Sequence, residues 1–215
     1  MERRSLAFRA EDVAPDGSSF AGWGSAFFTI DSYGSIIAPN AFDRTLQYFL
    51  DKGFVGGLNH DWNCPIGAPV EAKCDATKGL WVKGELVPTE AGKQAQILLA
   101  HKLSTGRPVI QSLSIGFDVL SSTDCRTADP VKAFWDRNGY TPSDADNEAL
   151  ALGIARFGIR IFKDVRLYEV SPVTVPANAL AEICEARAGK PRGARNRHEI
   201  DAELRLKLAL AGLSA

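Results

Sequence analysis

The chain has 215 residues, of which 45% are hydrophobic and 24% are charged, as is usual for a globular domain with a real core. A formal net charge of −1 excludes a general attraction to nucleic acid or to an anionic membrane. No apolar run approaches the roughly 20 residues of a membrane helix, and no apolar signal segment follows the charged start. Four scattered cysteines do not form a disulfide framework, so we expect reduced thiols in a cytoplasm: Cys64, Cys74, Cys125 and Cys184.

Strand patterns dominate the chain. They combine β-branched and aromatic residues with period-two alternation, and Gly, Pro, Asn or Asp interrupt them. Gly22 and Gly24 in the first strand indicate a bulge or a bend. The predicted strands, in chain order, lie over 20–30, 35–37, part of 54–62, a hairpin with 80–87 as its second strand, 108–120 and 158–176.

Two helices are expected between these strands. Asn40 is a strong N-cap residue, Asp43 completes a capping box, and Gly53 ends the first helix. Thr89 is expected to cap the second, and Glu90 suits its positive end. A third, short helix is predicted over 179–187.

The rest of the chain is polar. Pro130, Gly139 and Pro142 interrupt an acidic stretch, so we expect 121–157 to be a polar insert, mostly loop, in which Ala133, Phe134 and Trp135 form a short docking turn. The sequence predicts one domain over 1–187, followed by a basic linker and an amphipathic helix over 188–215.

The strand over 108–120 has a distinctive pattern. From Gln111 onward its two faces differ: Leu113, Ile115, Phe117 and Val119 form an apolar face, whereas Ser112, Ser114, Gly116 and Asp118 form a small, polar one. One interpretation is an edge strand with its polar face in water. The other is a strand that carries a nucleophilic serine, which then needs a base and an orienting group.

His60 is the best candidate for the base, because a short strand delivers it at its end. His101 is expected in solvent on the second helix, and His198 lies in the basic linker. The orienting acid is Asp61, Asp118 or Glu169.

Glu169 stands out because carboxylates are seldom buried unpaired, and its strand is otherwise apolar. It either forms an ion pair with Arg160 or Arg166, or holds the imidazole of His60.

Other chemistries have weaker support. His60, Cys64 and Cys74 offer three metal ligands, but no CxxC or HExxH motif supports a metal site. No glycine-rich phosphate loop is present, and neither Ser112 nor Ser114 lies in a GxSxG motif.

Taken together, these stretches resemble the prohead (capsid maturation) serine proteases of tailed phages. The matching segments run in order over about residues 18–185: Phe20-Ala21-Gly22, Ala38-Pro39-Asn40-Ala41-Phe42, Asn59-His60-Asp61, Pro65-Ile66-Gly67, Ser112-Leu113-Ser114-Ile115-Gly116-Phe117, Leu167-Tyr168-Glu169-Val170-Ser171-Pro172-Val173 and Pro176-Ala177-Asn178. Asn40 stands where the family usually has Gly.

The resemblance implies an α+β fold that is mostly β: a closed antiparallel β-barrel of the herpesvirus-protease type, with peripheral helices. It also implies Ser114 as nucleophile, His60 as general base and Glu169 as the acid. Ser112 is the alternative nucleophile. No cofactor or metal is implied, and the backbone near 154–160, including Gly158, is a guess for the oxyanion hole.

The implied function is a serine endopeptidase that cleaves the major capsid protein precursor and scaffold segments, and often itself, inside the immature procapsid in the host cytoplasm. A homodimer is left open, and neither membrane nor nucleic acid is an expected partner. The alternatives are a non-catalytic capsid or scaffold component with the same fold, a hydrolase of small esters, and a tail that acts as a scaffold-binding or nucleic-acid-binding arm.

Overall fold

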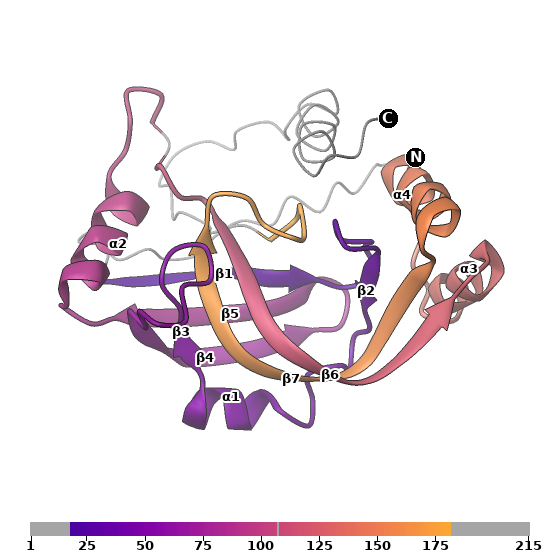
Figure 1. Ribbon diagram of the computed structural model, residues 1–215, viewed down its shortest axis with the longest axis horizontal. Coiled ribbons are helices and arrows are strands. Elements are labelled where there is room, and N and C mark those ends of the chain that lie inside the picture. Colours follow the sequence, from indigo (N-terminus) through magenta and orange to yellow (C-terminus); the bar gives the residue numbers. More distant parts are fainter. Residues whose placement is uncertain (1–17, 107, 182–215) are drawn as a thin grey trace. The chain divides into compact units, whose positions relative to one another are not determined.

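The computed structural model describes residues 18–106 and 108–181, all within one compact unit, Phe8–Ala186. Strands hold more of this part than helices do (Figure 1). In chain order the elements are β1 (Ser19–Ala26), β2 (Ser35–Ile37), α1 (Leu46–Lys52), β3 (Phe54–Val55), β4 (Gly67–Asp75), β5 (Gly79–Leu86), α2 (Glu90–Ala100), β6 (Ser112–Cys125), α3 (Ala128–Arg137), α4 (Asp144–Arg156) and β7 (Ile159–Val173).

The strands form one seven-stranded sheet with the order β1-β5-β4-β3-β7-β2, and β6 also pairs with β7. β2 and β3 run parallel to β7, and the other pairs are antiparallel. The sheet curls until β1 approaches β6: a Cβ on Gly24 would lie 2.9 Å from Ile115 Cγ2. No ladder joins these strands within the described residues, so the barrel is nearly closed. The α+β class is confirmed, whereas the herpesvirus type of barrel stays a prediction.

β6 and β7 form a long curved ribbon that crosses the β1, β5 and β4 strands (Figure 1). Its pairing runs from Ser112 opposite Val173 to Cys125 opposite Ile159. Helices α3 and α4 lie at the end where Cys125 pairs with Ile159. The ribbon therefore places residues of β6 beside residues of β7 that are distant in sequence.

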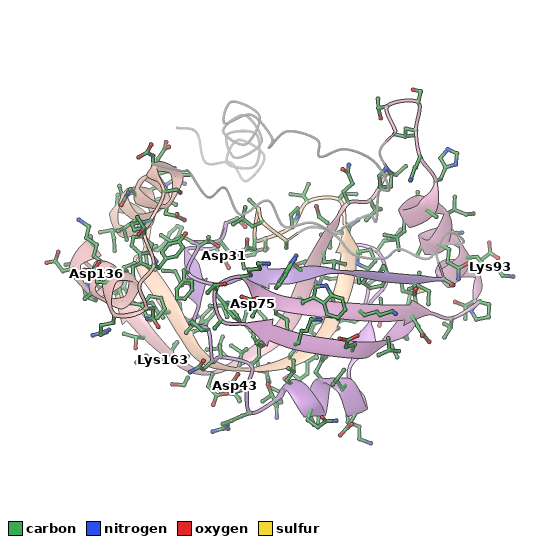
Figure 2. All side chains as sticks on the ribbon, turned by 180° about the vertical axis from the view of Figure 1, so that it is seen from behind. Asp31, Asp43, Asp75, Lys93, Asp136 and Lys163 are labelled. Carbon is green, nitrogen blue, oxygen red and sulfur yellow. The ribbon has the colours of Figure 1, made fainter. Side chains whose placement is uncertain are left out.

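The hairpin and the second helix follow the sequence prediction. Asp75 begins the turn between β4 and β5 (Figure 2), where its Oδ1 accepts the backbone N–H groups of Thr77 and Lys78. The Thr89 hydroxyl accepts the N–H of Gly92 at 3.1 Å, as expected of an N-cap.

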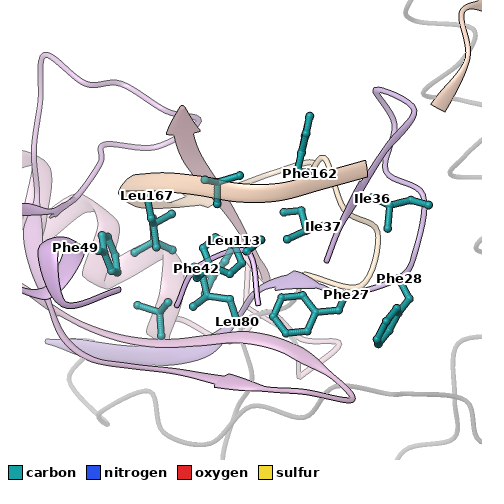
Figure 3. Packing of buried hydrophobic residues seen from close by; sticks show 14 of the residues in the cluster. Phe27, Phe28, Ile36, Ile37, Phe42, Phe49, Leu80, Leu113, Phe162 and Leu167 are labelled. Carbon is teal, nitrogen blue, oxygen red and sulfur yellow. The ribbon is translucent and has the colours of Figure 1, made fainter. Parts of the chain in front are cut away.

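A large apolar cluster fills the interior between the curled sheet and the helices (Figure 3). Phe27 stacks on Phe42 with ring centroids 6.1 Å apart. Leu113 of β6 and Leu167 of β7 are fully buried, and the rest of the apolar face predicted for β6 packs, partly buried, against the same cluster. Each such leucine contributes about 2 kcal/mol of hydrophobic stabilisation.

The first helix begins later than predicted. Asn40 does not cap it: α1 starts at Leu46 with Thr45 as N-cap, although Gly53 ends it as expected. The segment before it is held as turns because Ala41 O accepts the N–H of Val165 and the Thr45 hydroxyl donates to Val165 O. Contacts with β7 therefore override the local helix signal.

The first and central strands also differ from the prediction in length. β1 ends at Ala26, and its bulge lies between Trp23 and Ser25, at the predicted Gly24. β6 begins only at Ser112 but continues to Cys125.

The polar insert is ordered, which corrects the expected loop. It holds α3 and α4, and a capping box between Ser143 and Asp146 starts α4. Trp135 does dock: it is buried, and its Nε1–H donates to Phe28 O at 2.9 Å. Polar residues dominate here because each helix buries only a narrow stripe.

Two further predictions concern the ends of the chain. Most of the helix expected over 179–187, and all of the tail over 188–215, lie outside the described residues. Within the described ranges, no helix has the length and apolarity needed to cross a membrane.

Candidate active site

Four small or polar residues share one face of the β6–β7 ribbon. Ser114 lies directly opposite Ser171, and Gly116 lies directly opposite Glu169. Paired residues on antiparallel strands point to the same side, as do residues two apart along one strand. Ser114 of β6 is therefore a close neighbour of Ser171 and Glu169 of β7.

His60 reaches this face from the loop after β3. Phe54 of β3 pairs with Glu169, so the chain leaves β3 beside β7. His60 Nδ1 lies 2.6 Å from Glu169 Oε1, and the histidine side chain is 37% exposed whereas that of Glu169 is fully buried. Because a carboxylate can only accept, the proton of this hydrogen bond belongs on Nδ1. The second ring nitrogen, Nε2, is then left to act as a base.

The carboxylate of Glu169 sits in a tight, polar enclosure. Its second oxygen, Oε2, accepts a hydrogen bond from the hydroxyl of Ser171. A Cβ on Gly116 would lie 2.5 Å from Oε1, and a Cβ on Gly56 would lie 2.8 Å from Oε2. Both positions must therefore lack a side chain for this carboxylate to fit.

The loop that carries His60 has an uncommon backbone. Asn59 and His60 have φ angles of 57° and 64°, in the left-handed region that few residues other than glycine adopt. Asn59 is among the residues that tolerate it best, and its N–H donates to Pro172 O at 3.0 Å. Its side-chain Oδ1 accepts from the N–H and the hydroxyl of Thr174. Asn59 thus fastens the loop to β7 and aims the imidazole at Glu169.

Ser114 is close to this pair but is not bonded to it. The residue is buried, with 6% of its surface exposed. In the part of the chain that the structure describes, no hydrogen bond joins Ser114 to His60. Bonds between a nucleophile and its base are often long before substrate binds, so the arrangement remains compatible with a serine nucleophile.

The alternative site residues lie elsewhere. Ser112 lies two residues before Ser114 on β6, opposite Val173. Asp61 is exposed, and its Oδ1 accepts the N–H of Asn63 at 3.1 Å. His101 follows the last turn of α2 and is exposed, and His198 lies outside the described residues.

The ion pair proposed between Glu169 and an arginine is wrong. Arg160 pairs with Asp124 at 3.2 Å, and Arg166 pairs with Asp118 at 2.7 Å. Asp118 also accepts from the hydroxyl of Tyr168. The partner of Glu169 is His60, and Asp118 is not available to orient the imidazole.

An aromatic pair adjoins the candidate site. The rings of Trp62 and Tyr168 meet edge to face at 6.4 Å, and Trp62 is more than half exposed. Trp62 follows His60 by two residues, and Tyr168 directly precedes Glu169. The pair therefore adjoins both His60 and Glu169 along the chain.

The guess for the oxyanion hole is wrong. Gly158 precedes Ile159, which pairs with Cys125 at the opposite end of the ribbon from Ser114. The N–H of Gly158 is also engaged, with Gly153 O at 2.9 Å.

The metal ligands considered from the sequence do not form a cluster in the described part of the chain. The described residues contain no group of three or more His, Cys, Asp or Glu side chains that could hold a metal ion. Burial, and to a lesser extent the charge of Asp43, raises the pKa of the Cys74 thiol to about 11.

Two residues of the site were not singled out from the sequence. Ser171 had no signal beyond being polar in an apolar strand, the same signal that marked Glu169. Asn59 had a weak signal, because Asn next to a functional residue in a loop favours left-handed backbone.

Comparison with known proteins places the chain among phage proteins. The sequence profile of the caudovirus prohead serine proteases matches residues 4–136, which include His60 and Ser114 but not Glu169. The prohead protease of Enterobacteria phage HK97 is 29% identical over 190 residues, covering 86% of this chain and 69% of that protein. No solved structure matches this chain significantly.

Proposed function

Because the chain belongs to the caudovirus prohead serine protease family and is a capsid maturation protease, we propose that its catalytic residues are Ser114, His60 and Glu169. The observation that carries this proposal is the 2.6 Å contact between His60 Nδ1 and the buried carboxylate of Glu169, beside a strand that presents Ser114. A nucleophile, a base and a group that orients the base are the parts that acyl transfer requires.

In the proposed reaction, His60 Nε2 takes the hydroxyl proton of Ser114 as its Oγ attacks the carbonyl carbon of a peptide bond. The imidazolium then gives this proton to the leaving amine, and the C–N bond breaks to leave an acyl-enzyme. Water attacks the ester carbon, His60 takes a proton from the water, and the proton returns to Ser114 Oγ as the ester bond breaks.

The buried carboxylate supports both halves of this cycle. Glu169 holds the proton of the neutral imidazole on Nδ1, which leaves Nε2 as the base. When the imidazole becomes positively charged, the carboxylate 2.6 Å away stabilises it, and burial strengthens this attraction because water screens it little.

The substrates we propose are the major capsid protein precursor and scaffold segments, cleaved inside the immature procapsid, together with the protease itself. This rests on the family and on the relative from phage HK97, whose name assigns it to the prohead. The proposed mechanism needs no cofactor. A homodimer also stays a proposal.

Mass spectrometry of the cognate capsid precursor, co-expressed with this chain, tests the proposal. Wild type is compared with Ser114→Ala, His60→Ala and the control Ser112→Ala. We expect a defined cut that is lost in the first two variants and kept in the third. A cut that survives Ser114→Ala would exclude Ser114 as nucleophile, and an uncut precursor with wild type would favour a non-catalytic capsid component.

A further inference from the structure

We propose that Ser171 is a positioning residue that holds the carboxylate of Glu169 in the orientation His60 requires. This inference rests on the proposed function, since it assigns a fourth residue to the same site. Ser171 lies on β7, two residues after Glu169 and directly opposite Ser114. Its hydroxyl donates a hydrogen bond to Glu169 Oε2.

The need for Ser171 follows from the burial of Glu169. The carboxylate side chain has no exposed surface, so water cannot satisfy its oxygens. His60 Nδ1 binds one oxygen and the Ser171 hydroxyl binds the other. With both oxygens bonded, the plane of the carboxylate is fixed. Without the hydroxyl, Oε2 would be left unpaired in a dry enclosure, and the carboxylate would turn to find another donor.

Gly56 packs closely against the hydrogen bond between Ser171 and Glu169. A Cβ on Gly56 would overlap Ser171 Oγ and would lie 2.8 Å from Glu169 Oε2. The backbone of the loop that carries His60 is thus packed directly against this hydrogen bond. A shift of the carboxylate would therefore displace both the imidazole and its loop.

Ser171 is not a second nucleophile. It is fully buried, and its hydroxyl proton is already donated to Glu169. Ser114, directly across the ribbon, has 6% of its surface exposed and no such bond to the acid. The two serines therefore have different tasks, although they face each other on paired strands.

The first test is kinetic. Ser171→Ala, Ser171→Cys and Ser171→Thr are compared with the control Ser25→Ala, which removes a buried serine hydroxyl from β1, a strand that pairs with β5 rather than with β7. We expect Ser171→Ala to lower kcat for a capsid-derived peptide by about 10- to 100-fold with little change in KM, because a misplaced base costs about this much. Ser171→Cys, a weaker donor, should be intermediate, and Ser171→Thr should restore most of kcat. A wild-type kcat in Ser171→Ala would overturn the proposal.

The second test does not need activity. In a Ser114→Ala background, the Nδ1 proton of His60 is followed as a downfield resonance in the ¹H NMR spectrum. We expect this resonance to persist in Ser25→Ala and Ser171→Thr but to broaden or disappear in Ser171→Ala. If it is unchanged in Ser171→Ala, Ser171 does not position Glu169, whether or not the chain is a protease. If Ser171→Ala does not fold, the same comparison is made with Ser171→Cys.

Discussion

Asn59 and Thr174 join the loop that carries His60 to the end of β7. Asn59 Oδ1 accepts both the N–H of Thr174 at 3.0 Å and its hydroxyl at 3.1 Å. The two residues are far apart in sequence, yet their contact sets where the imidazole stands relative to Glu169. This contact links the position of the proposed base, His60, directly to the strand that carries Glu169.

Replacing Asn59 should therefore reduce activity more than stability. Asn59→Gly keeps the left-handed backbone but loses the acceptor, and Asn59→Asp keeps both. We expect Asn59→Gly to cost about 1 kcal/mol of unfolding free energy and about tenfold in kcat, because the loop is loosened but not removed. Urea unfolding and peptide cleavage measure the two effects. Equal activity of Asn59→Gly and Asn59→Asp would show that the hydrogen bonds from Thr174 to the side chain of residue 59 are dispensable.

A side chain at Gly116 should disrupt the acid. In Gly116→Ala, the new methyl group would lie 2.5 Å from Glu169 Oε1, and the carboxylate must then move or the strands must separate. We expect activity to be lost and the free energy of unfolding to fall by about 1 to 3 kcal/mol.

A double-mutant cycle with Glu169→Ala separates this clash from other effects of the methyl group. The acid is absent from the double variant, so the methyl group has nothing to clash with. The double variant should therefore lose less unfolding free energy than the sum of the losses in the two single variants. Additive losses would mean that Gly116 and Glu169 do not meet.

The helical insert should stabilise the fold without taking part in the reaction. Trp135→Phe removes the Nε1–H that donates to Phe28 O and part of a buried ring. We expect a loss of about 1 to 3 kcal/mol in chemical unfolding. Cleavage of a peptide should change less than twofold, because α3 lies at the opposite end of the ribbon from Ser114. A large fall in kcat in fully folded Trp135→Phe would show that the insert acts on the site.

Asp31, on the loop between β1 and β2 (Figure 2), should make stability depend on pH. Burial raises its pKa from 3.8 to about 6, although it accepts the N–H groups of Tyr33 and Ser35. The folded state therefore holds this proton more tightly than the unfolded chain. Its contribution to stability is complete below about pH 4 and is lost as the pH rises through about 6.

Asp31→Asn keeps an oxygen acceptor but removes the titration. Between pH 4 and pH 7, wild type should lose about 1 to 3 kcal/mol of unfolding free energy relative to this variant. Thermal or urea unfolding at several pH values measures the difference. Parallel curves for the two proteins would mean that Asp31 does not titrate in this range.

The sequence predicts a residue of the candidate site only where the residue type is unusual for its place in the chain. Glu169 can be found because a carboxylate in an apolar strand needs a partner, and His60 can be found because few histidines compete with it. The small polar face of the strand marks Ser112 and Ser114 alike, and the resemblance to the protease family selects Ser114. Ser171 cannot, because its importance lies in a hydrogen bond that strand periodicity does not reveal.

The same residues can indicate a loop or the ends of helices, which explains the error over 121–157. Pro130 lies in the first turn of α3, where proline is tolerated. Gly139 follows the end of α3 with a φ of 65°, as a helix-terminating glycine does. Pro142 directly precedes Ser143, the N-cap of α4. What resembles a run of loop residues is therefore a set of helix boundaries around short amphipathic segments.

The predicted start of the first helix is wrong for a different reason. Asn40 and Asp43 form a good local capping signal, but Phe42 is fully buried and Ala41 is bonded to β7. Contacts with a strand more than a hundred residues away decide the outcome, and a local pattern cannot show them.

Covalent labelling of the nucleophile tests the central claim most directly. The protein is incubated with a fluorophosphonate, which reacts with activated serines, and the modified peptide is identified by mass spectrometry. We expect a single adduct on Ser114 in wild type, and labelling that is strongly slowed in His60→Ala and Glu169→Ala. An adduct on Ser112 or Ser171, or labelling of Ser114 at an unchanged rate without His60, would contradict the proposed triad.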